Sequence, residues 1–306
     1  MHERQEGVSV IVPCRNAGRY LAEAIDSLCA QPWAGPWEAI VVDDASDDPA
    51  TLLDLEQLRT TSNVRVLQLP EHCGVQTARN TGLAAAAFAY TMQLDADDRL
   101  ATDPGLLADG TYPDRAVALL RADPGMAFVH TMAHMFGAAT GYTISSYPCT
   151  EALIATKHHA PISLVCRTSQ ALAAAYNPAV RKWQDWAFAI ALLAERARHG
   201  RPNRIGCIPG PFYDYRIHHR PGRLSQTAIS EHAATAPVVE SHLTYFQRFH
   251  GAGRDADTIT ADLIAAKPDR LTDLLHMAAF DLPQALTLAR QRQYQLTGCW
   301  DELGIP

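Results

Sequence analysis

Between Val8 and Leu94, short apolar segments of the chain alternate with amphipathic segments whose apolar residues recur at helical spacing. This alternation is typical of parallel strands joined by helical crossovers. We therefore predict an α/β fold with a Rossmann-like, mostly parallel central sheet. The predicted strands span residues 8–12, 39–42, 64–69 and 90–94, and the predicted helices span residues 20–30, 52–59 and 77–88.

Polar residues follow three of these four strands at the point where each strand ends. The three polar segments are Pro13-Cys14-Arg15-Asn16, Asp43 to Asp48, and Asp95-Ala96-Asp97-Asp98. Because open α/β sheets bind ligands outside the carboxyl ends of their strands, we expect the three segments to face one crevice.

After Arg99 the pattern of the chain changes to mixed elements. We predict a strand near 127–130, helices near 169–175 and 184–198, and a pair of strands near Ile205 and Tyr213. From residue 229 onward helical patterns predominate, over residues 237–249, 269–280 and 283–296, and Pro237 suits a first helical turn. The chain thus divides into an α/β domain, residues 1–228, and a helical C-terminal extension, residues 229–306, which would also supply the contact of a homodimer.

The composition argues against several classes of partner. A net charge of −7 and a pI near 6.0 leave no excess of basic residues for binding nucleic acid or an anionic membrane. No apolar run approaches the ~20 residues of a membrane-spanning helix, and the polar N-terminus contains no targeting segment. The seven cysteines form no Cys-x-x-Cys pair, so no zinc site is indicated. We expect a cytoplasmic protein.

The acidic segment Asp95-Ala96-Asp97-Asp98 is the strongest candidate for chemistry. Three carboxylates within four residues repel each other unless a cation or protons intervene. A hard cation that prefers oxygen ligands, Mg²⁺ or Mn²⁺, is the natural companion, and it would also bind substrate phosphates. The alternative is a solvated acidic turn that caps the following helix.

The segment from Asp43 to Asp48 is a second candidate. A carboxylate at the end of a strand can accept hydrogen bonds from a base N–H or from ribose hydroxyls. The alternative is that Ser46 or Asp48 caps the next helix.

Four segments together resemble glycosyltransferase family 2, in order and with similar gaps. They are Val10-Ile11-Val12-Pro13-Cys14-Arg15-Asn16, Val42-Asp43-Asp44-Ala45-Ser46, Gly74 to Leu83 containing Ala78-Arg79-Asn80, and Leu94-Asp95-Ala96-Asp97-Asp98. The resemblance implies a GT-A fold, a nucleoside-diphosphate sugar donor, Mn²⁺ or Mg²⁺, and inversion at the anomeric carbon. Within residues 1–228 it implies a nucleotide-sugar half, residues 1–100, and an acceptor half, residues 101–228.

The resemblance also implies roles for individual residues. Pro13, Asp43 and Asp44 would line the nucleobase pocket, Arg79 would reach the base or a phosphate, and Asp95 would meet the ribose or the donor sugar. Asp97, with Asp98, would bind the metal. The full donor-binding set implied in this way is Pro13, Arg15, Asn16, Asp43, Asp44, Arg79, Asp95, Ala96 and Arg216. For Arg79 the alternative is a structural ion pair with a neighbouring carboxylate.

Inverting transfer also needs a base that takes the proton of the acceptor. The segment Trp183-Gln184-Asp185-Trp186 resembles the acidic pair of the family at the start of a helix, with Gln184 in place of the first acid and Asp185 in the position of the base. Desolvation beside two indoles would raise the proton affinity of Asp185. The alternative is an aspartate that stabilises the helix dipole.

The segment from Tyr213 to Arg220 resembles the family's Tyr-Arg-x-His loop, which implies closure over the diphosphate. His218 would be a further metal ligand, and Arg216 or Arg220 a phosphate contact. The alternative is a surface cluster of histidines.

These residues favour an inverting glycosyltransferase with a UDP or dTDP type donor. Its acceptor would be a small molecule, a glycan or a peptide. Two alternatives stay open, a nucleotidyltransferase that forms a nucleotide sugar and a non-catalytic protein that binds one.

Overall fold

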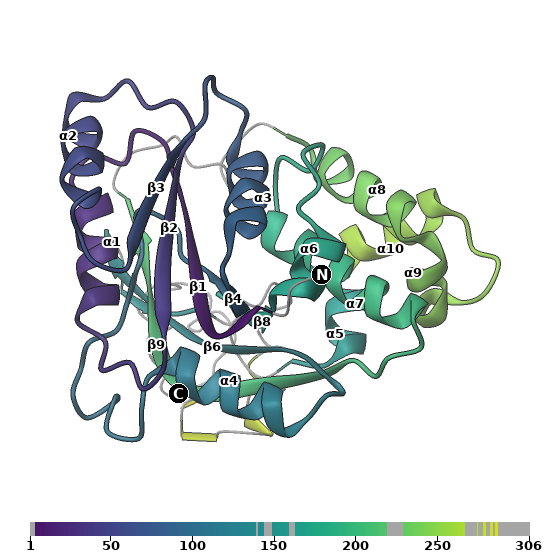
Figure 1. Ribbon diagram of the computed structural model, residues 1–306. Helices are drawn as coiled ribbons and strands as arrows, with labels where there is room; N and C mark the ends of the chain where they lie inside the picture. Colours follow the sequence, from purple (N-terminus) through teal and green to yellow (C-terminus); the bar gives the residue numbers. More distant parts are fainter. Residues whose placement is uncertain are drawn as a thin grey trace, which may run out of the picture.

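A mixed sheet, of nine strands in the part of the chain that the structure describes, forms the centre of the protein (Figure 1). The computed structural model describes residues 4–138, 140–143, 149–158, 163–218 and 229–266, with isolated positions between 274 and 286. Among these residues the strand order is β3-β2-β1-β4-β8-β6-β9-β5, and β7 pairs with β6 outside that path. The predicted α/β architecture is confirmed.

The first half of the chain follows the predicted alternation closely. Its strands β1 to β4 are mutually parallel neighbours, because β1 pairs with both β2 and β4, and β2 pairs with β3. The elements are β1 (Gln5–Cys14), α1 (Tyr20–Cys29), β2 (Trp37–Asp43), α2 (Pro49–Leu58), β3 (Val64–Gln68), α3 (Val75–Ala85) and β4 (Phe88–Gln93).

The second half adds strands of both directions to the same sheet. Strand β8 lies antiparallel between β4 and β6, whereas β6 and β9 pair in parallel. The elements are β5 (Arg99–Leu100), α4 (Tyr112–Ala122), β6 (Met126–Gly137), β7 (Gly141–Tyr142), α5 (Glu151–Thr156), β8 (Val165–Arg167), α6 (Thr168–Ala174), α7 (Gln184–Arg198) and β9 (Arg204–Ile217).

The prediction of two strands near Ile205 and Tyr213 is wrong, because both residues belong to the single strand β9. The register of β9 against β6 shifts between Thr131 and Ala133, and the Thr131 hydroxyl lies within hydrogen-bond distance of the Ile208 and Gly210 carbonyls. Pairing of β9 with β6 resumes at Tyr213 after this irregularity. Helix α4, capped by the side chain of Thr111, was not predicted.

Within residues 229–266 the structure describes three helices, α8 (Glu231–Ser241), α9 (Leu243–His250) and α10 (Ala256–Ala265). Pro237 lies inside α8 and not in a first turn, because the Ser230 side chain caps the helix earlier by accepting from the Ala233 N–H. The predicted helices over 269–280 and 283–296 fall largely outside the described residues. No described helix has the length and apolarity to cross a bilayer.

The sheet separates two apolar cores. Val10 and Val12 of β1 pack with α1, whereas Ile11 packs on the opposite face with α3, as the two-residue period of a strand requires. Figure 1 shows α1 and α2 on one side of the sheet and α3 on the other. The core on the side of Ile11 continues through α7 to the C-terminal helices, where the rings of Trp186 and Phe246 are 6.1 Å apart. The division of the chain at residue 228 stays a prediction.

Close packing of α3 on β1 generates a stability test at Gly82. A Cβ at this position would clash with Cγ2 of Ile11 and lie 3.3 Å from Val42. We expect Gly82→Ala to lower the free energy of unfolding by about 1–2 kcal/mol, because overpacking outweighs the gain in helix propensity. Urea unfolding measures the change. Gly35→Ala, where a Cβ meets nothing within 4 Å, is the matched control and should be neutral; equal stability of the two variants would contradict the packing described here.

Candidate active site

The three polar segments of the sequence leave the sheet side by side. Their strands are neighbours in the order β2-β1-β4. Backbone hydrogen bonds continue past the strand ends, from Asp44 N to Cys14 O at 2.8 Å and from Leu94 N to Ile11 O at 3.0 Å. The three segments therefore lie at one edge of the sheet, and the crevice that they were expected to face stays a prediction.

Asn16 links the first polar segment to the second. Its Oδ1 accepts from the N–H groups of Asp47 and Asp48 at 2.9 and 3.1 Å, and its Nδ2 donates to Asp47 Oδ1 at 2.7 Å. The residue has a φ of +50°, a conformation that asparagine adopts more readily than most residues. Arg15 beside it is exposed, and Pro13 is buried at the end of β1. The structure thus gives Asn16 a scaffolding contact at the edge where donor binding was predicted.

Asp43 and Asp44 are both buried and both accept hydrogen bonds from nearby backbone. Asp43 Oδ1 accepts from Ser46 N at 3.1 Å. Asp44 accepts from Cys73 N at 2.7 Å and Gly74 N at 2.9 Å, and its Oδ2 lies 2.7 Å from Nδ1 of His72. Asp44 therefore holds the loop that precedes α3. The sequence analysis did not predict this structural role.

The alternative reading of the second segment holds for Asp48. Its Oδ2 accepts from Thr51 N at 2.8 Å and caps α2. The segment from Asp43 to Asp48 therefore contains helix-capping and loop-holding groups at the predicted binding edge.

Arg79 links two other predicted site residues, Asp95 and Asp185. Its Nη2 donates to Asp95 Oδ1 at 2.7 Å, and its Nη1 lies 3.3 Å from Asp185 Oδ1. The guanidinium also lies over the ring of Tyr176, 5.1 Å from its centroid. The ion pair that was the structural alternative for Arg79 is present, and both of its partners are predicted site residues.

Asp185 lies in the first turn of α7, two residues after the N-cap Trp183, whose backbone is left-handed with a φ of +59°. Trp186 is fully buried and donates from Nε1 to Ile154 O at 2.9 Å, which anchors the first turn of the helix. The Asp185 side chain is 44% exposed. Desolvation raises its pKa, Arg79 opposes that shift, and Asp95 adds to it. An accessible carboxylate with a raised pKa suits a general base.

Asp97 and His218 form the second pair that the sequence predicted. Nε2 of His218 lies 2.6 Å from Asp97 Oδ2, and the Asp97 side chain is 41% exposed. The His218 ring packs edge-on against Tyr20 with centroids 5.2 Å apart. An oxygen and a nitrogen atom that could bind a metal ion therefore lie side by side at this edge of the sheet.

Asp98, which was also predicted as a metal ligand, has both carboxylate oxygens bonded to groups of β9. It is buried, its Oδ2 accepts from the Tyr213 hydroxyl at 2.8 Å, and its Oδ1 accepts from Arg216 N at 2.7 Å. Burial raises the pKa of Asp98 well above its usual value, and the charges of Asp97 and Asp95 raise it further. With both oxygens occupied by β9, Asp98 anchors that strand to the acidic segment.

Arg216 is also engaged within the protein. Its Nε donates to Asp97 O at 2.6 Å and its Nη2 to Glu23 Oε2 at 2.5 Å. The guanidinium lies between the rings of Tyr20 and Phe136, 4.4 and 4.3 Å from their centroids. The phosphate contact predicted for Arg216 stays a prediction, for a side chain that already holds Asp97 O and Glu23. The other candidate for this contact, Arg220, lies outside the residues that the structure describes. Glu23 was missed, because nothing in its local sequence points to β9.

A divalent cation at this site would take its protein ligands from Asp97 and His218. In the part of the chain that the structure describes, no group of three His, Cys, Asp or Glu side chains is arranged to hold a metal ion. Asp97 and His218 supply two adjacent ligand atoms of the kind that Mn²⁺ accepts. Such a pair fits a cation whose remaining ligands come from substrate phosphates and water.

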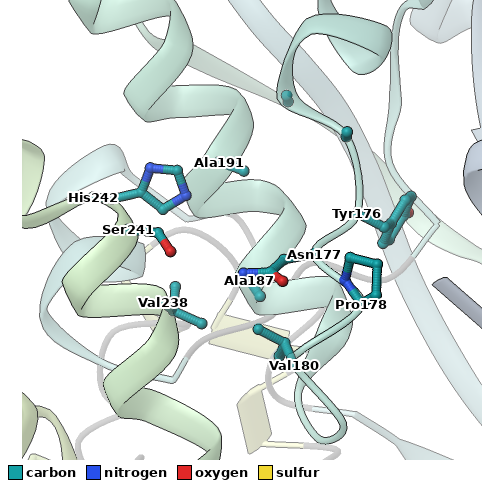
Figure 2. Close-up of a pocket in the computed structure, with 11 residues that line it drawn as sticks. Tyr176, Asn177, Pro178, Val180, Ala187, Ala191, Val238, Ser241 and His242 are labelled. Atoms are coloured by element: carbon teal, nitrogen blue, oxygen red, sulfur yellow. The ribbon is translucent and has the colours of Figure 1, made fainter. Parts of the chain in front are cut away.

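A separate cavity of about 330 Å³ lies between residues 174–180, α7 and α8 (Figure 2). Its lining is mostly apolar, including Val180, Ala187 and Val238. The pKa of His242 in its wall is lowered by burial and by Arg198, which keeps the ring neutral near pH 7. None of the predicted site residues lines this cavity, so it is not the predicted donor site.

Comparison with known proteins supports the resemblance read from the motifs. Residues 9–108 match the sequence model of glycosyl transferase family 2. The chain is 34% identical over 96 residues to the Bacillus subtilis putative teichuronic acid biosynthesis glycosyltransferase TuaG. The aligned region covers 31% of this chain and 38% of TuaG. The chain is 33% identical over 93 residues to the Streptococcus pneumoniae glycosyltransferase GlyG, covering 30% and 31% of the two chains. The matched region is thus about a third of the length of these relatives.

The fold resembles solved glycosyltransferase structures over nearly the whole chain. A crystal structure of Staphylococcus aureus TarS in complex with UDP-GlcNAc gives a TM-score of 0.64 at 21% identity, covering 94% of this chain and 81% of the other. The mannosyltransferase PcManGT from Pyrobaculum calidifontis, in complex with GDP-Man and Mn²⁺, gives a TM-score of 0.54 at 18% identity, covering 96% and 81%. The predicted GT-A fold is confirmed.

The two aspartates Asp97 and Asp98 should respond differently to truncation. We expect Asp98→Ala to lower the free energy of unfolding by roughly 1–3 kcal/mol, because the Tyr213 hydroxyl and the Arg216 N–H lose a buried acceptor. Asp97→Ala is the matched control and should cost about 0–1 kcal/mol, because its pair with His218 is partly exposed. Urea unfolding of both variants measures the difference, and a larger loss for Asp97→Ala would refute the anchoring role of Asp98.

Proposed function

Because the chain belongs to glycosyl transferase family 2 through residues 9–108 and has the GT-A fold, we propose that it is an inverting nucleotide-sugar glycosyltransferase. The observation that carries this proposal is the bridge of Arg79 between Asp95 and Asp185, at 2.7 and 3.3 Å. It joins a carboxylate of the donor edge to the candidate base. A transferase that forms a bond between donor and acceptor needs groups for both within one site.

The proposed donor is a UDP or dTDP sugar, bound along the carboxyl ends of β2, β1 and β4. Support for a uridine nucleotide comes from TarS, whose solved complex contains UDP-GlcNAc. UDP-GlcNAc is therefore the first donor to assay. The proposed acceptor is a hydroxyl-bearing small molecule, glycan or peptide.

The proposed metal is Mn²⁺ or Mg²⁺, held by Asp97 and His218. Such a cation would neutralise charge on the departing nucleoside diphosphate. Support comes from the adjacent ligand atoms of these two residues and from PcManGT, whose complex contains Mn²⁺ with GDP-Man.

In the proposed reaction Asp185 takes the proton of the acceptor hydroxyl. The freed oxygen attacks the anomeric carbon from the side opposite the leaving group, and the bond from that carbon to the diphosphate oxygen breaks. The nucleoside diphosphate leaves with the electron pair of that bond. The exposed position and raised pKa of Asp185 support this role.

The two other functions receive less support. The family match favours sugar transfer over nucleotidyl transfer, which attacks the α-phosphate and would release pyrophosphate from a nucleoside triphosphate. An accessible base candidate beside the donor edge favours catalysis over binding alone.

Removal of the base should abolish turnover without abolishing donor binding. We expect Asp185→Asn to lower the release of UDP from UDP-GlcNAc by about 100-fold or more, because an amide cannot accept the proton. UDP release is followed with a coupled assay and UDP binding by calorimetry. Glu195→Gln, at the other end of α7, is the control and should keep full activity. Undiminished turnover by Asp185→Asn would remove Asp185 from the mechanism.

Removal of the metal ion should weaken binding of the nucleotide. We expect UDP with Mn²⁺ to raise the melting temperature by several degrees, since a ligand of the native state stabilises it, and EDTA to abolish the shift. Asp97→Asn and His218→Gln should each reduce the shift, because each loses a metal ligand. Asp109→Asn, on an exposed loop, should behave as the unmodified protein. A shift of equal size in EDTA would count against a metal-dependent donor site.

A further inference from the structure

The positive charge of Arg79 lies beneath two carboxylates that face outward. The Arg79 side chain is 4% exposed, whereas Asp95 and Asp185 are 38% and 44% exposed. A nucleotide bound at this edge of the sheet would therefore meet the carboxylates first. Although burial by itself lowers the pKa of Arg79, the two carboxylates raise it, so the guanidinium remains charged. This geometry differs from the direct base or phosphate contact that the family resemblance implies for Arg79.

The position of Arg79 relative to Asp185 is fixed by contacts between α3 and the segment before α7. Asn80 Nδ2 donates to Tyr176 O at 2.8 Å, and Tyr176 N donates back to Asn80 Oδ1 at 2.8 Å. One turn earlier, Gln76 donates to Val180 O. The Tyr176 ring stacks on Phe188 of α7, with centroids 4.1 Å apart and planes 6° apart. Helix α3 and the start of α7 thus form one packed unit with Arg79 inside it.

The contact from Arg79 to Asp185 is electrostatic without being a directed hydrogen bond. Nη1 lies 3.3 Å from Asp185 Oδ1, but within the described residues neither Nη1 nor Nε makes a hydrogen bond. The carboxylate of Asp185 is therefore compensated in charge while its lone pairs stay available. This is the condition that a base needs before it accepts the hydrogen of an acceptor hydroxyl.

We infer that Arg79 is a positioning residue, whose buried guanidinium holds the base Asp185 ionised and in register with the donor-side carboxylate Asp95. The inference rests on the proposed role of Asp185 as the base. It assigns Arg79 an action through these two carboxylates and not through contact with the nucleotide.

The charges around Asp185 predict opposite effects for two substitutions. Desolvation raises its pKa, Arg79 on α3 lowers it, and Asp95 after β4 raises it. The buried Tyr176 hydroxyl faces the same group, and burial keeps its pKa above the usual value, so it stays neutral. Loss of the Arg79 charge therefore raises the pKa of Asp185, and loss of the Asp95 charge lowers it. The base is active when ionised, so a higher pKa moves the loss of activity on acidification to higher pH.

The test is a pH titration of the Asp185 carboxyl by ¹³C NMR in the full chain, with Asp185→Asn used to assign the signal. We expect Arg79→Gln to raise the pKa of Asp185 by about one unit or more, and Asp95→Asn to lower it. Arg79→Lys keeps the charge and should leave the pKa within about half a unit of the unmodified protein. Arg121→Gln, which removes an exposed arginine paired with Glu6, is the matched control and should change nothing.

The opposite signs keep the inference falsifiable even if Arg79→Gln does not fold, because Arg79→Lys and Asp95→Asn remain. An unchanged pKa of Asp185 in Asp95→Asn, or a shift of more than one unit in Arg79→Lys, would overturn it. Calorimetry with UDP gives an independent readout. Retained UDP affinity in Arg79→Lys supports action through the carboxylates, and loss of that affinity would instead assign Arg79 to the nucleotide. None of these measurements requires turnover, so failure of the proposed transferase reaction is seen separately, in the UDP-release assay.

Discussion

Parallel pairing of β1 with both β2 and β4 is the constraint on which the site depends. The register aligns Val8 to Cys14 of β1 with Trp37 to Asp43 of β2, so the two polar strand ends lie at the same height. Strand β4 joins on the other side of β1, which brings the acidic segment after it to the same edge. Carboxylates gathered in this way repel one another unless each is hydrogen-bonded, paired or protonated. The rest of the site can be understood as the way the chain meets that requirement.

The carboxylates at this edge avoid unfavourable repulsion in two ways. Asp44 and Asp98 are buried, and their oxygens accept hydrogen bonds from backbone N–H groups and from the Tyr213 hydroxyl, which fixes loops and a strand. Asp97 and Asp185 remain partly exposed, each beside one side chain that is or can become cationic. Buried polar groups without partners would be costly, so the interior ones hold the scaffold, and the outer ones are left for ligands.

The C-terminal helices contribute to the site through α7. Trp186, one residue after the candidate base, packs toward Phe246 of α9 in the same core that contains α3. The start of α7 is therefore supported from both sides, by α3 with Tyr176 and by the helices after residue 229. We interpret the extension as part of what holds Asp185 in place.

Local periodicity was sufficient to determine the strands and helices between Val8 and Leu94 and the three polar strand ends, because these depend on near neighbours along the chain. Only the tertiary structure decided which carboxylates are buried and hydrogen-bonded within the protein and which stay partly exposed. Asp98 is occupied by Tyr213 and Arg216, and Arg79 meets Asp185, across more than a hundred residues in each case. Likewise the two strands predicted near Ile205 and Tyr213 are one strand, β9, whose pairing with β6 resumes at Tyr213 after an irregularity. Burial and partner choice arise only when distant segments pack, and for that reason the chemistry of the individual aspartates could not be read from their spacing.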